Sequence, residues 1–96
     1  MVRCRKCGKP LDKETSMTTA FDEIRCEHCY DDYLMTDRGK VEYFLGICKG
    51  DFPMDYYDAD FLGHVATCWK KYRNELYIPA KVLADIEIHA ACIGLL

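Results

Sequence analysis

The sequence lacks an excess of positive charge: it has 13 lysines and arginines against 16 aspartates and glutamates, for a net charge of −3. A protein that coats the nucleic-acid backbone usually needs a basic surface, so we do not expect this to be the main activity of the chain. The sequence also lacks any apolar run near the roughly 18 residues of a membrane span, and no apolar stretch follows Met1. We therefore expect a cytoplasmic protein with neither a membrane segment nor a secretion signal.

The sequence also lacks the short motifs that mark common catalytic sites. The nucleophile elbow, the phosphate-binding loop and the paired-histidine zinc motif are all missing. We predict that the chain is not an enzyme. The alternative is a metal-dependent enzyme that uses a mixed site of histidine and cysteine.

Apolar residues are scarce at the start of the chain. Residues 4–29 contain only a handful of them: Leu11, Met17, Ala20, Phe21 and Ile24. Since so few apolar side chains cannot form a sufficient core, something else must hold this segment together.

Cysteine is abundant, with seven residues in a chain of 96, and four of them form two C-x-x-C pairs. Cys4 and Cys7 form the first pair, and Cys26 and Cys29 form the second. Two such pairs at this separation are typical of structural zinc sites, in which four thiolates surround the metal at about 2.3 Å. Gly8 supports this prediction because the turn after a metal knuckle often needs a positive φ. We expect one structural Zn²⁺ ion with no open coordination position.

Three alternatives to this zinc site remain open. The four cysteines could be free core residues or a redox pair, or they could hold iron as in a rubredoxin-like site. His28 lies inside the second C-x-x-C pair and could replace one of the cysteines as a ligand. The odd number of cysteines, together with the expected cytoplasmic location, favours reduced cysteines over disulfides.

At these residues the chain resembles the treble-clef and zinc-ribbon group of four-cysteine fingers. A C-x-x-C pair followed by glycine, and then a second C-x-x-C pair that opens a helix, is similar to the finger of the DksA/TraR family and to the first half of LIM domains. GATA-type fingers share a similar spacing. The resemblance covers residues 3–35 and implies metal ligation by Cys4, Cys7, Cys26 and Cys29.

The hydrophobic pattern predicts a mainly α fold, with a zinc-finger module over residues 1–36 and a unit of about three helices over residues 37–96. Within the module, residues 17–25 are expected to form a hairpin arm with Phe21 facing the knuckles, and a helix is expected to start near Cys29. Thr36 or Asp37 is expected to cap the next helix, which ends at Gly50.

Two further helices are expected toward the end of the chain. Asp58 or Asp60 is expected to cap the first of them. Its apolar stripe comprises Phe61, Val65, Cys68, Trp69, Tyr72 and Leu76. The last helix would begin near Pro79 and cover residues 82–93, with a strand starting at Ile86 as the alternative.

The remaining cysteines and histidines are candidates for a second metal site. They are Cys48, His64, Cys68, His89 and Cys92. His64 and Cys68 lie four residues apart on one helical face, and His89 and Cys92 lie three apart. The alternative is that the cysteines simply pack as small hydrophobic residues.

Two surface segments could bind partners. In the acidic and aromatic loop over residues 51–60, the candidate contacts for a basic protein surface are Asp51, Asp55, Tyr56, Tyr57 and Asp58. This loop could instead cap the core with Phe52 and one tyrosine. A basic cluster around the first knuckle could touch phosphates, and it comprises Arg3, Arg5, Lys6 and Lys9.

Taken together, these patterns predict a small intracellular zinc protein that binds and regulates another protein. By analogy of class, such a chain could be a phage or mobile-element accessory inhibitor of host machinery. The alternative is a nucleic-acid-binding zinc finger that regulates transcription. The apolar segment over residues 82–96 slightly favours a homodimer, unless its end docks onto the stripe of the preceding helix.

Overall fold

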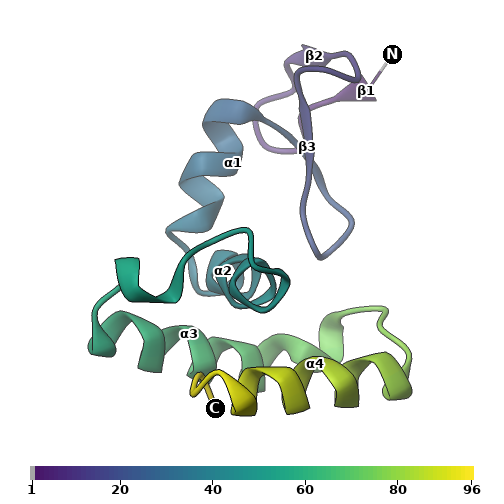
Figure 1. The fold of residues 1–96 in the computed structure, drawn as a ribbon. Coiled ribbons are helices and arrows are strands. Elements are labelled where there is room, and N and C mark those ends of the chain that lie inside the picture. The colour runs from purple at the N-terminus through teal and green to yellow at the C-terminus, as the bar shows by residue number, and fades with distance from the viewer. Residues whose placement is uncertain (1) are drawn as a thin grey trace.

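The computed structural model describes residues 2–96, which contain four α-helices and two small antiparallel hairpins. Both hairpins and helix α1 (Glu27–Leu34) lie at one end of the molecule, while α2 (Asp37–Lys49), α3 (Ala59–Tyr72) and α4 (Ala80–Cys92) pack together at the other end (Figure 1). The mainly α prediction is broadly confirmed. The structure has one helix more than the predicted three-helix unit, and this helix, α1, lies in the cysteine-rich segment, where a helix was expected to start near Cys29.

The first hairpin encloses the first C-x-x-C pair. Strand β1 (Val2–Arg3) pairs with β2 (Pro10–Leu11), with Val2 opposite Leu11. The chain reverses between the two strands through Gly8, whose φ of 77° falls in the left-handed region that glycine adopts freely. The prediction that Gly8 supplies a positive φ in the turn after the knuckle is therefore confirmed.

The second hairpin reaches from the cysteines to the helical end. Strand β3 (Ser16–Thr18) pairs with β4 (Ile24–Cys26), and Ser16 lies opposite Cys26. This register puts Cys26 at one end of the hairpin and the turn at the other end. The prediction that Phe21 faces the knuckles is therefore wrong: Phe21 packs against the helical core, with the Arg38 guanidinium 4.9 Å from the centre of its ring.

Helix α2 (Asp37–Lys49) begins and ends at the predicted residues. The Thr36 side chain caps it by accepting a hydrogen bond from the backbone N–H of Gly39, and Gly50 ends it with a φ of 83°. Gly39 also lies against the end of α1: a Cβ atom at this position would lie 1.9 Å from the backbone oxygen of Tyr33. Since no side chain fits there, glycine is required where α1 and α2 meet.

Helices α3 (Ala59–Tyr72) and α4 (Ala80–Cys92) complete the helical end. Asp58 caps α3 by accepting a hydrogen bond of 2.7 Å from the backbone N–H of Phe61, and Pro79 is the residue before α4. Two short 3₁₀ turns, η1 (Met54–Tyr56) and η2 (Arg73–Glu75), flank α3. The core that these elements bury comprises Val41, Phe44, Ile47, Val65, Trp69, Leu76, Ala90 and Leu95.

The last segment is helical rather than extended, so the strand alternative at Ile86 is wrong. Ala90 is fully buried on the inner face of α4, while Ile88 remains 63% exposed. Leu95 belongs to the same core cluster as Trp69 and Leu76, so the end of the chain docks onto this core. Between residues 2 and 96, no helix has the length and apolar character needed to cross a membrane.

Candidate metal centre

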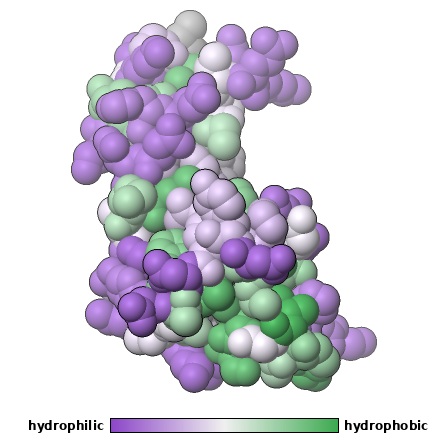
Figure 2. All heavy atoms as spheres, turned by 60° about the vertical axis from the view of Figure 1, so that its left-hand side comes forward, coloured by the Kyte–Doolittle hydropathy of each residue, from purple (hydrophilic) through white to green (hydrophobic). Residues whose placement is uncertain are grey.

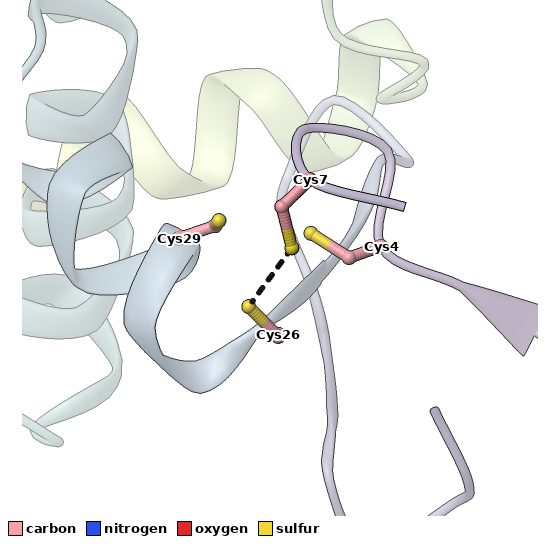
Figure 3. A group of neighbouring side chains, drawn as sticks. All are labelled: Cys4, Cys7, Cys26 and Cys29. Carbon is pink, nitrogen blue, oxygen red and sulfur yellow. Dashed lines mark hydrogen bonds between the residues drawn. The ribbon is translucent and has the colours of Figure 1, made fainter. Parts of the chain in front are cut away.

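The four cysteines of the two C-x-x-C pairs converge on one point. Their sulfur atoms all lie within 4.8 Å of one another, and the Sγ atoms of Cys7 and Cys26 are 3.8 Å apart. Figure 3 shows the four side chains pointing inward from two segments of the chain. A tetrahedron of sulfurs around a metal at about 2.3 Å has an edge of about 3.8 Å. The arrangement therefore has the dimensions of a four-thiolate metal site.

Local secondary structure places each of the four sulfurs. Cys4 follows β1 and Cys7 lies in the turn before Gly8, while Cys26 ends β4 and Cys29 lies in the first turn of α1. The two segments are fastened together by a hydrogen bond of 2.8 Å from the backbone N–H of Arg5 to the carbonyl of Ile24. Thus one turn and one helix start supply two ligands each.

The site is largely shielded from water. Cys4, Cys26 and Cys29 are buried and form a small cluster with Leu11, whereas Cys7 is exposed. This cluster is separate from the core around Trp69. Three of its four buried members are candidate metal ligands, so bound metal would tie together residues that apolar contacts alone hold weakly.

The electrostatics of the cluster favour a cation at its centre. Burial alone raises the pKa of the Cys4 thiol, but hydrogen bonds from the backbone of Cys7, Cys26 and Lys6 outweigh it and lower this pKa to about 5. The pKa of Cys29 rises to about 12, first because its thiol hydrogen-bonds to Cys26 and then because it is buried. Four sulfurs this close cannot all carry negative charge unless a cation compensates them.

The donor set narrows the metal to those that take four thiolates, which are zinc and iron. Four thiolates in a tetrahedral arrangement suit Zn²⁺, and they leave no position open for a substrate. His28, the alternative ligand, lies at the surface with 86% of its side chain exposed and its Nε2 3.7 Å from Asp32. The cysteine set therefore provides four sulfurs without needing the histidine.

The five remaining cysteines and histidines do not meet at one place. His64 and Cys68 lie together, with Asp37 as their third neighbour. Cys48 and His89 line a shallow groove of about 230 Å³ between α2 and α4, and Cys92 is exposed. Sequence reasoning missed Asp37, because only the packing of α2 against α3 brings it to His64.

The candidate partner loop divides into structural and exposed residues. Asp58 caps α3, and the half-buried Tyr57 stacks on Phe61 with 4.7 Å between ring centres. Phe52 is also half-buried and packs against the helical core. The three remaining candidates are exposed, namely Asp51, Asp55 and Tyr56, and Tyr56 is 80% exposed.

The candidate phosphate contacts all lie at the surface around the first knuckle. Arg3, Arg5, Lys6 and Lys9 are exposed, and the Arg3 guanidinium donates a hydrogen bond of 3.2 Å to the carbonyl of Gly8. This contact keeps Arg3 close to the turn that carries Cys7.

No protein-family model matches the chain, and no curated protein or solved structure shows significant similarity to it.

Proposed function

We propose that the cysteine-rich end is a structural zinc finger of the treble-clef type and that it holds one Zn²⁺ ion. The support is the source of the ligands: two come from the turn of a hairpin and two from the first turn of the helix that follows a second hairpin. Elemental analysis of protein purified without chelator should find one zinc per chain. Protein that contains neither zinc nor iron would contradict the proposal.

The function that we propose is regulation of another protein by direct binding. The observation that carries it is the exposed acidic and aromatic loop, while the closed four-sulfur cluster leaves a bound metal no position for a substrate and so favours a structural metal. The surface that we assign to the partner is the exposed part of the acidic loop: Asp51, Asp55 and Tyr56. A tyrosine beside carboxylates suits a basic protein surface, because the ring supplies contact area while the charges steer the approach.

The matched test compares two exposed tyrosines. Tyr56 and Tyr77 are 80% and 92% exposed, and neither belongs to the core cluster. The unmodified chain and the three variants Tyr77→Ala, Tyr56→Ala and Asp55→Ala are each used to capture proteins from the source organism. A partner of the loop should bind the unmodified chain and Tyr77→Ala but not Tyr56→Ala or Asp55→Ala. Equal capture by all four baits would contradict the assignment of this surface.

The rival function is nucleic-acid binding through Arg3, Arg5, Lys6 and Lys9. Its support is that all four basic side chains are exposed around one turn. Binding of this kind weakens steeply as salt rises, because counterions are released from the phosphates. Salt-dependent binding to DNA or RNA that is lost when Lys6 and Lys9 are both changed to glutamate would favour this rival over protein regulation.

The oligomeric state that we propose is a homodimer formed through the exposed apolar side chains of α4. Its support is the exposure of large apolar side chains there, with Val82 at 46% and Ile88 at 63%. Burial of Leu95 within its own chain removes one of the apolar residues that this dimer was expected to cover. Light scattering at micromolar concentration decides, since a mass of 11.1 kDa that persists on concentration would reject the dimer.

A further inference from the structure

A second group of potential metal ligands lies where the start of α2 packs against α3. His64 and Cys68 are one helical turn apart on α3, and Asp37 is the first residue of α2. One ligand atom from each residue lies within 4.8 Å of the other two. The His64 Nε2 and the Asp37 Oδ1 are 3.6 Å apart.

The three side chains offer one nitrogen, one sulfur and one oxygen. Zn²⁺ accepts all three of these donor types, and protein sites with three ligands keep a fourth position for water or another ligand. Two ligands spaced by four residues on a helix face the same side, which is a spacing that metal-binding helices use. The neighbouring core residues Val65 and Trp69 are fully buried and anchor this stretch of α3.

We propose that Asp37, His64 and Cys68 form a second divalent-metal site, suited to Zn²⁺, with an open fourth position. Cys68 is 3% exposed and forms the floor of the site. The side chains of His64 and Asp37 are 49% and 54% exposed, so the metal can enter from solvent. This site would differ from the four-cysteine cluster, which has no position left for an outside ligand.

The same three residue types could instead form a nucleophilic cysteine with a histidine base, but the geometry disfavours this reading. A substrate cannot reach a thiol that is 3% exposed. Burial, and then the nearby charge of Asp37, raises the pKa of Cys68, so this thiol stays protonated unless a cation replaces the proton.

The charged surroundings set the order of affinity between the two sites. The ammonium groups of Lys40 and Lys71 lie close enough to act on Cys68. Their positive charges repel a divalent cation, and the site has one thiolate where the other has four. The second site should therefore fill only after the four-cysteine site is full.

Cobalt titration of protein loaded with one equivalent of Zn²⁺ tests the proposal directly, because that zinc fills the four-cysteine site and leaves the second site empty. The four-cysteine site keeps its Zn²⁺, and added Co²⁺ reports the second site through visible bands and a sulfur-to-cobalt charge-transfer band. The unmodified chain should bind one Co²⁺. Substitution of a residue that only orients a metal ligand typically weakens metal binding by roughly 10- to 100-fold. His64→Ala and Asp37→Asn remove ligands, so each should weaken Co²⁺ binding by at least this much.

Two controls make the outcome decisive. His28→Ala removes a histidine that is 86% exposed and lies outside the site, so it should bind Co²⁺ like the unmodified chain. Asp37 and His64 are both exposed, and circular dichroism with zinc content will show that their variants fold. The proposal is overturned if excess Co²⁺ does not bind, if both variants bind it unchanged, or if it binds without a charge-transfer band from Cys68.

Discussion

The cysteine-rich end and the helical end differ in what they bury. The cysteine-rich end has a cluster of four buried residues, three of them cysteines, whereas the helical end buries eight residues around Trp69. Their surfaces differ as well: in Figure 2, hydrophilic side chains dominate the end that carries the cysteines, and hydrophobic ones gather at the opposite end. The comparison indicates that apolar burial can hold the helical end, while the cysteine-rich end buries too few apolar residues to be held in the same way.

The largest expected effect is loss of the metal centre by Cys26→Ser. Cys26 is a sulfur of the cluster and also the N-cap residue of α1, so serine removes the ligand but keeps a good capping residue. Structural zinc contributes on the order of 10–16 kcal/mol to the folding of small fingers. We expect amide exchange to become fast over residues 2–35 and to stay slow in α2 and α3.

The matched control for this variant is Cys92→Ser, because Cys92 is exposed and lies outside the cluster. It should keep one zinc and the exchange pattern of the unmodified chain. If Cys26→Ser made the whole chain exchange at once, the two ends would share one cooperative unit, and the contrast between them would not hold.

The second-largest expected effect is loss of stability at the helical end, with the metal site left intact. Trp69 is fully buried and stacks on Phe44 with 4.3 Å between ring centres. Trp69→Ala should lower the free energy of unfolding by about 3–5 kcal/mol, measured by denaturant titration of the helical signal. The four-cysteine site should still take up one Co²⁺ with a four-sulfur spectrum. Tyr77→Ala is the control, because this ring is 92% exposed and its loss should leave the unfolding curve in place.

A smaller effect separates the structural and exposed carboxylates of the acidic loop. Asp58→Ala removes the cap of α3 and should cost about 1 kcal/mol of unfolding free energy. Asp55→Ala changes an exposed residue three positions earlier and should leave stability unchanged. Equal losses from both variants, measured by thermal unfolding, would mean that the whole loop stabilises the helical end.

The smallest effect concerns Glu42, which joins the two ends. Its carboxylate accepts hydrogen bonds from the backbone N–H of Ala20 in the second hairpin and from the Tyr33 hydroxyl of α1. Burial raises the pKa of Glu42 above its usual range, so the folded protein favours the protonated form. The contribution of this group to stability is therefore greatest at low pH and falls as pH rises through the raised pKa.

Glu42→Gln removes this titration and keeps an oxygen that can accept hydrogen bonds. The difference in unfolding free energy between the variant and the unmodified chain should shift in favour of the variant as the pH rises above the ordinary glutamate pKa of about 4.3. Denaturant titrations at several pH values measure this shift. A difference that does not change with pH would show that Glu42 has the same pKa in the folded and unfolded chains.

Local sequence signals predicted much of both ends. A helix cap interacts only with backbone groups a few residues away. The positions of Thr36, Gly50 and Asp58 alone therefore indicated where helices begin and end. The spacing of the four cysteines likewise indicated the metal cluster. Contacts between distant segments carry no such local signal: the docking of Phe21 on the helices and the approach of Asp37 to His64 depend on how the elements pack.

The close approach at Gly39 has a mechanical consequence. Where the start of α2 passes the end of α1, backbone meets backbone and there is no room for even a methyl group. Any side chain at position 39 would have to push these two backbones apart, so the spacing between the end of α1 and the start of α2 depends on this glycine. A surface formed by both ends of the molecule would therefore change shape with any substitution at Gly39, even though the glycine itself contributes no side chain to it.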